Sequence, residues 1–135
     1  MSAKPDLDTV RLLRRARDLI DRRYADGLTI PDVAAHVHLS PAHFTRSFRA
    51  LYGESPHQYL LTRRLERAAW LLRQGASVTD ACIAVGLSSV GSFSTRFREV
   101  YGETPSAYAR REHADIELVP PFVAARFTRR RRYED

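Results

Sequence analysis

A twenty-residue stretch of this chain occurs twice, and the repeat limits the folds that the chain can adopt. Residues 40–59, SPAHFTRSFRALYGESPHQY, and residues 89–108, SVGSFSTRFREVYGETPSAY, are identical at nine aligned positions. The similarity extends upstream, where TIPDVAAHVHL at 29–39 matches SVTDACIAVGL at 77–87. A period of about 48–49 residues in a chain of 135 leaves room for two copies of one supersecondary unit. We therefore expect two small subdomains of the same design.

Each copy has the signals of two short helices joined by a tight turn. Thr29 and Ser77 stand three residues before an Asp, which is a capping pattern at a helix start. His38 and Gly86 tolerate the left-handed backbone that ends such a helix. A second helix follows, and its apolar residues recur at spacings of four and three, which is typical of one buried face. That face consists of Phe44, Phe48 and Leu51 in one copy and of Phe93, Phe97 and Val100 in the other.

Similar signals place the remaining helices. Gly followed by Ser-Pro or Thr-Pro ends one helix and starts the next, and a further helix is expected at about 8–25. The sequence thus predicts an all-α fold of about seven helices, with two helix-turn-helix subdomains joined by a long linker helix. We expect one domain over residues 1–112, with its parts at about 28–51 (first helix-turn-helix), 56–74 (linker), 77–100 (second helix-turn-helix) and 105–112 (closing helix). Residues 113–135 show no clear period and are expected to form a basic, extended or disordered tail.

Charge and composition narrow the class of partner. The net charge is +6, and all but one of the 22 basic residues are Arg. Arginine binds phosphates and base edges with a planar fork of donors, so this composition suits a polyanion-binding surface and, equally, a solvated surface with surplus charge. No apolar run approaches the eighteen residues of a membrane span, and the N-terminus lacks the apolar core of a signal peptide. We therefore expect a cytoplasmic protein that does not enter a membrane.

The outward face of each second helix is the candidate site. At 100° per residue, the face opposite the phenylalanines in the first copy carries two arginines among small residues, which suits a major groove. The second copy is poorer in Arg, and Arg96 lies nearer the buried arc, where a phosphate contact or an internal ion pair suits it better. We infer more base recognition in the first copy and more positioning in the second. The predicted contact residues are Ala42, His43, Thr45, Arg46, Arg49, Gly91, Ser92, Ser94, Thr95, Arg96 and Arg98.

The linker length supports two contacts with one DNA molecule. A helix of roughly eighteen residues is about 27 Å long, and successive major-groove faces lie about 34 Å apart. The capping turns make up the difference, so one chain acting as a monomer is expected to place two helices in adjacent grooves.

The pattern of helices and motifs over residues 8–112 resembles that of a known family. Two helix-turn-helix units joined by RRLERAAWLL, the second closed by GLSSVGSFSTRFREVYGETPSAY, are similar to the DNA-binding domain of AraC/XylS-type bacterial transcription regulators over residues 8–112. The resemblance implies sequence-specific binding of double-stranded DNA near promoters through residues 41–51 and 90–100, often with activation by contact with RNA polymerase. Many members carry Arg where this chain has Thr95. Most also carry an effector domain, for which 135 residues leave no room, so a stand-alone version is expected.

Other interpretations remain open or are disfavoured. A nucleoid-type protein that keeps the fold without sequence recognition is the main alternative. An enzyme, such as a DNA-repair methyl acceptor using Cys82, is not expected because Cys82 lies on an apolar helix face. The three histidines at 36, 38 and 43 do not share a helix face and have no acidic or Cys partner, so neither a metal site nor a cofactor is predicted. The linker arginines Arg63, Arg64 and Arg67 suit phosphate contacts and internal ion pairs equally.

Overall fold

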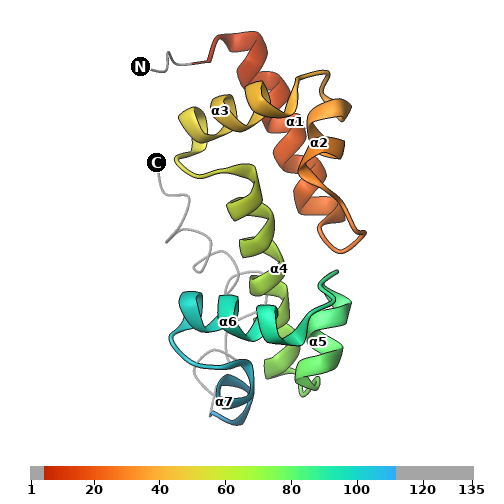
Figure 1. Cartoon of the computed structure of the whole chain (residues 1–135), viewed down its shortest axis with the longest axis vertical. Helices are drawn as coiled ribbons and strands as arrows, with labels where there is room; N and C mark the ends of the chain where they lie inside the picture. Colours follow the sequence, from red (N-terminus) through yellow and green to blue (C-terminus); the bar gives the residue numbers. More distant parts are fainter. Residues whose placement is uncertain (1–4, 112–135) are drawn as a thin grey trace. The chain divides into compact units, whose positions relative to one another are not determined.

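The computed structural model describes residues 5–111, and within this range the chain forms seven α-helices and no strand (Figure 1). The all-α prediction is confirmed. No helix in the described part is long and apolar enough to cross a membrane. The predicted tail, residues 113–135, lies outside the described residues. The helices are α1 (Leu7–Arg23), α2 (Ile30–His36), α3 (Pro41–Tyr52), α4 (Pro56–Arg73), α5 (Val78–Ala84), α6 (Val90–Tyr101) and α7 (Pro105–Arg110).

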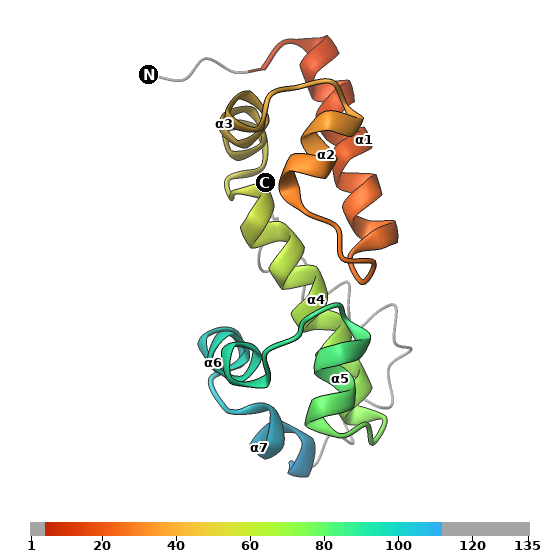
Figure 2. The ribbon, with the colours of Figure 1, turned by 45° about the vertical axis from the view of Figure 1, so that its right-hand side comes forward.

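The chain divides into two compact units, and the division falls inside α4, between Arg63 and Arg64. In the first unit α1, α2 and α3 contact one another in all three pairs. Figure 2, in which α3 is seen almost along its axis, shows that α3 crosses the α1–α2 pair. In the second unit α6 contacts both α5 and α7, and these helices lie beside the C-terminal half of α4 (Figure 1). Each unit therefore contains one copy of the sequence repeat.

The predicted helix caps are present. Thr29 Oγ1 accepts a hydrogen bond of 3.2 Å from the backbone N–H of Asp32, whose carboxylate accepts one of 3.3 Å from the Thr29 N–H. Both halves of this capping box satisfy donors that a helix start leaves unpaired. Five later helices begin with a hydroxyl that accepts from the N–H three residues on, and these hydroxyls belong to Ser40, Ser55, Ser77, Ser89 and Thr104.

The core of the first unit is organised around Phe48. Its side chain is fully buried, and its ring lies 4.7 Å from the ring of Tyr52 and 5.8 Å from that of Tyr59, measured between centroids. Tyr59 in turn donates a hydrogen bond to the Asp21 carboxylate of α1, which also accepts one of 3.0 Å from Arg63 Nε. This carboxylate therefore ties the start of α4 to α1 on the side where the phenylalanine packs.

The second unit repeats the aromatic packing with a different polar tie. Phe97 is fully buried, and its ring centroid lies 4.5 Å from Tyr101 and 5.3 Å from Tyr108. Here the tyrosine hydroxyl of Tyr108 accepts a hydrogen bond of 2.7 Å from Arg73 Nη1. The rings thus match those of the first unit, while the charge beside the buried hydroxyl is reversed.

The predicted buried faces of α3 and α6 need one correction. Phe44, Phe48, Phe93 and Phe97 are buried as expected, but Leu51 and Val100 are only partly buried. Both residues lie in the last turn of their helices, where the neighbouring helices cover less of the surface. The core therefore depends on the four phenylalanines more than on these aliphatic residues.

In each copy a single turn joins the two helices of the helix-turn-helix. The two turns share a left-handed backbone conformation at one position but have different residues there. His38 has φ +61° and Gly86 has φ +86°, so both occupy the left-handed region, and His38 is the one described non-glycine residue that does. A Cβ atom in this conformation costs roughly 1–2 kcal/mol, whereas glycine loses more chain entropy on folding, by roughly 0.5–1 kcal/mol.

We expect His38→Gly to raise the free energy of unfolding by about 0.5–1 kcal/mol, because the Cβ penalty exceeds the added entropy of glycine. The exchange Gly86→His should lower it by a similar amount. Urea unfolding of both variants, followed by far-UV circular dichroism, measures the two changes. Equal stability of His38→Gly and the unmodified chain would mean that the imidazole makes contacts that offset the backbone penalty.

Candidate nucleic-acid interface

The outward face of α3 is polar and accessible. Phe44 and Phe48 fill the opposite side of the helix and are fully buried. Because they fix the rotation of α3, the residues on the opposite side of the helix face away from the core. The predicted contact residues of this copy are all accessible: Ala42, His43, Arg46 and Arg49 are exposed, and Thr45 is partly exposed.

The two arginines of α3 are available to a ligand. Neither the Arg46 nor the Arg49 side chain forms a hydrogen bond or an ion pair with another residue in the range 5–111, whereas the side chains of Arg63 and Arg73 are bound to Asp21 and Tyr108. A free guanidinium keeps five N–H donors in a flat fork that matches a phosphate or the O6 and N7 atoms of guanine. The α3 face therefore presents two unsatisfied donor groups one turn apart.

Two of the linker arginines, Arg63 and Arg67, differ in their partners and in their exposure. Arg63 Nε lies 3.0 Å from the Asp21 carboxylate, and only 13% of its side chain is exposed, so it serves the fold. Arg67 is exposed, and its guanidinium carbon lies 4.1 Å from the ring centroid of Trp70. Stacking on Trp70 leaves the edges of that guanidinium accessible.

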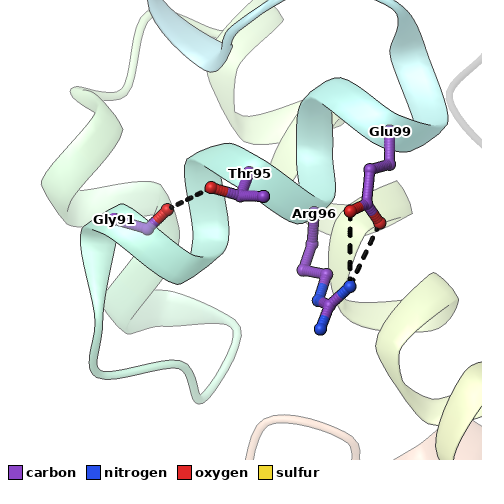
Figure 3. A network of polar contacts seen from close by, with 4 residues as sticks. All are labelled: Gly91, Thr95, Arg96 and Glu99. Carbon is purple, nitrogen blue, oxygen red and sulfur yellow. Dashed lines mark hydrogen bonds and ion pairs between the residues drawn. The ribbon is translucent and has the colours of Figure 1, made fainter.

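The outward face of α6 is accessible but chemically different. Gly91, Ser92, Thr95 and the two arginines at 96 and 98 are exposed, and Ser94 is partly exposed. The Thr95 hydroxyl donates a hydrogen bond of 3.1 Å to the Gly91 carbonyl, four residues back along the helix (Figure 3). That hydroxyl proton is therefore engaged within α6 before any ligand arrives.

Arg96 forms an ion pair on the surface of α6. Its Nη1 lies 3.3 Å from Glu99 Oε1 and 3.2 Å from Oε2, as Figure 3 shows. Of the two roles expected for this residue, the internal ion pair is the one present, although both side chains are 56% exposed rather than close to the core. The three-residue spacing that allows this pair is visible in the sequence, but the helix-face pattern alone does not identify Glu99 as the partner. Arg98 has no such partner among the described residues.

Cys82 is a core residue. Its side chain is fully buried in α5, and Sγ lies 3.6 Å from the Leu87 carbonyl oxygen, to which the thiol donates. Burial raises the pKa of the Cys82 thiol. Both features oppose thiolate chemistry, because a reactive cysteine needs exposure and a lowered pKa.

Comparison with known proteins agrees with this geometry. Residues 33–111 match the family model described as a helix-turn-helix domain. The chain is 31% identical over 110 residues to the regulatory protein PocR of Salmonella typhimurium, covering 81% of this chain and 36% of that protein. It is 29% identical over 105 residues to the bifunctional transcriptional activator and DNA repair enzyme AdaA of Bacillus subtilis, covering 77% and 48%. The chain thus spans less than half the length of these relatives.

Two solved structures are similar over most of the described residues. A probable AraC family transcriptional regulator from Rhodopseudomonas palustris has a TM-score of 0.68 and 29% identity, with 75% of this chain and 96% of that one covered. The DNA-binding domain of AdpA, a global transcriptional factor, was solved in complex with a target DNA, and it has a TM-score of 0.68 and 28% identity, with 72% and 88% covered. The repeat, the helices and these matches agree, and the chain belongs to the AraC-type helix-turn-helix family.

Proposed function

We propose that this chain is a sequence-specific double-stranded-DNA-binding transcription regulator of the cytoplasm. The observation that carries the proposal is the face of α3, where Arg46 and Arg49 are exposed and free of partners among the described residues, opposite the buried phenylalanines. In a helix-turn-helix the second helix enters the major groove and contacts base edges. Two unsatisfied guanidinium forks on that helix suit guanine O6 and N7.

The second helix-turn-helix supports a second contact with the same DNA. The exposed face of α6 combines Arg98 with small residues, so the helix backbone can approach the groove closely. Its supporting helix α4 has 18 residues, or about 27 Å at 1.5 Å per residue, against a groove spacing of about 34 Å. A monomer with α3 and α6 in adjacent major grooves would protect two segments one helical turn apart.

Serine and threonine caps add contacts to the DNA backbone in this proposal. Helix N-termini carry free N–H groups and a partial positive charge, so they bind phosphate oxygens. Such contacts set the register of a protein on DNA without specifying sequence. The AdpA domain, with 28% identity, binds a target DNA in its crystals. RNA polymerase is the further partner that the family resemblance suggests for activation.

We do not assign an enzymatic activity to this chain. One relative, AdaA, is a bifunctional DNA repair enzyme, but the described residues place Cys82 inside a helical core with a raised thiol pKa. A methyl acceptor would need a thiolate that meets the damaged DNA. DNA binding without bond-making chemistry therefore fits the described residues better.

Selection from a random duplex pool, followed by footprinting of the winning site, tests the proposed function. We expect one bipartite motif, protected by a monomer in two segments about 10 base pairs apart. The monomer is verified by sedimentation of the complex. Enrichment of no motif, with equal affinity for all duplexes, would instead identify a nucleoid-type binder. Protection of a single segment would contradict the use of two recognition helices.

A further inference from the structure

The two recognition helices offer DNA different chemistry at equivalent positions. In the aligned repeat, Thr95 of α6 stands where α3 has Arg46, and Gly91 stands where α3 has Ala42. The α3 side chain is a free donor fork, whereas the Thr95 hydroxyl already donates to the Gly91 carbonyl at 3.1 Å (Figure 3). The Thr95 hydroxyl oxygen therefore keeps acceptor capacity alone, and the methyl group is the part of this side chain that can make an apolar contact with a base edge.

The internal hydrogen bond also fixes the position of that methyl group. Threonine in a helix divides between two rotamers, and a bond from its hydroxyl to the carbonyl four residues back selects one of them. Thr95 is exposed on the side of α6 opposite Phe93 and Phe97, which are buried. A preset rotamer loses little entropy on binding, so a single methyl contact can be worth most of its transfer free energy.

Gly91 leaves room beside this methyl group. Its φ does not lie in the left-handed region, and a Cβ built on it would meet no atom within 4 Å apart from its chain neighbours and the backbone of its own helix. Neither backbone conformation nor packing within the described residues therefore requires glycine here, at the second residue of α6. Glycine is useful at such a place when a ligand approaches the backbone closely.

Arg96, which follows Thr95 in the chain, is also engaged. Arg96 is held by both carboxylate oxygens of Glu99 at 3.2–3.3 Å, and the equivalent of Glu99 in α3 is Ala50. An arginine that shares its donors with a carboxylate on its own helix is a weaker ligand for guanine. At the positions of Thr95 and Gly91, α6 thus offers a methyl group and space where α3 offers the Arg46 fork, while the exposed Arg98 lies one turn further along the same face.

We infer that α6 recognises a thymine through the C5-methyl group of the base, which packs against the Thr95 methyl group in the space above Gly91. In the major groove this methyl distinguishes thymine from the other three bases, and small apolar side chains are its usual partners. The inference rests on the proposed function, since it assumes that α6 enters a major groove. It gives α3 a guanine-containing half-site and α6 a thymine-containing one.

Replacement of thymine by deoxyuridine in the selected duplex tests the inference, because it deletes the one methyl group and keeps the base pair. We expect one thymine of the α6 half-site at which deoxyuridine lowers affinity by about fourfold, the factor for one buried methyl group. The α3 half-site is identified as the segment whose preference is lost in Arg46→Ala. Deoxyuridine outside the footprint serves as the control and should change nothing.

Two substitutions of Thr95 separate its methyl group from its hydroxyl. Thr95→Ser keeps the hydroxyl and should lower affinity about fourfold, after which deoxyuridine at the same base should have almost no additional effect. Thr95→Val keeps a methyl group and should retain the sensitivity to deoxyuridine. Gly91→Ala should weaken DNA binding while thermal unfolding shows equal or greater stability, which a merely structural glycine would not do.

The outcomes distinguish this inference from the proposed function. Selection of a bipartite motif with no deoxyuridine effect in the α6 half-site would overturn the thymine contact and leave the regulator standing. Undiminished sensitivity to deoxyuridine in Thr95→Ser would also overturn it, because another residue would then contact the methyl. Loss of deoxyuridine sensitivity in Thr95→Val but not in Thr95→Ser would overturn it in favour of a hydroxyl contact. Selection of no motif at all would overturn the proposed function and the inference with it.

Discussion

Phe48→Ala is expected to lower the free energy of unfolding of the first unit by about 3–5 kcal/mol. The ring is fully buried and touches Tyr52 and Tyr59, so its removal leaves a cavity lined by two aromatic rings. Small domains are stable by only about 5–15 kcal/mol in total. The loss is therefore a large share of the stability of this unit.

Urea unfolding measures the total loss, and native-state hydrogen exchange locates it. Faster exchange is expected first at the amides of α2 and α3, which pack together in the first unit. Phe97→Ala is the matched variant, and it should instead affect α5 and α6. Leu51→Ala serves as the control for a partly buried position and should be milder. Equal acceleration of both units by Phe48→Ala would contradict the division of the chain into two units with separate cores.

Arg46→Ala is expected to weaken binding to the selected duplex by about 1–3 kcal/mol and to relax base preference at one position of one half-site. The reason is geometric, because Arg46 is exposed opposite Phe44 and Phe48 and has no partner among residues 5–111. A bidentate contact with guanine is lost entirely when the fork is removed. Fluorescence anisotropy with the selected duplex and a scrambled duplex at several salt concentrations measures the effect.

Two further variants identify which property of Arg46 matters. Arg46→Lys keeps the charge and loses the fork, so it should retain the salt dependence of binding and lose most of the sequence preference. Arg22→Ala removes an exposed charge of α1, outside both recognition helices, and controls for net charge. Equal weakening of binding to selected and scrambled duplexes by Arg46→Ala would make Arg46 a phosphate contact.

Local signals in the sequence were sufficient to predict the helices and the accessibility of the candidate site residues. The capping hydroxyls at Thr29 and Ser89 act on backbone groups three residues away, so their effect can be predicted without knowing the fold. The four-residue spacing of the phenylalanines determined the rotation of α3 and α6 and hence their outward faces. The DNA contacts of the eleven predicted residues stay predictions, since accessibility is what the described structure adds.

Partners within the site were less predictable. The three-residue spacing of Arg96 and Glu99 is compatible with an ion pair, and the position of Arg96 is also compatible with a phosphate contact. The sequence could not decide between the two, because the choice depends on the side-chain conformations on the surface of α6. The hydrogen bond from Thr95 to Gly91 similarly depends on one rotamer of threonine. These choices decide which donors remain for DNA.

The sequence by itself determined the repeat, the helix boundaries, the phenylalanine faces and the excess of arginine, because each depends on composition or on residues three or four positions apart. Tertiary structure decided how each unit is tied together. Asp21 meets Tyr59 and Arg63 across 38 and 42 residues, and Arg73 meets Tyr108 across 35. Such contacts exist only once the helices have packed, and no periodicity along the chain encodes which polar groups then face one another. For this reason the same tyrosine of the repeat is held by a carboxylate in the first unit and by a guanidinium in the second.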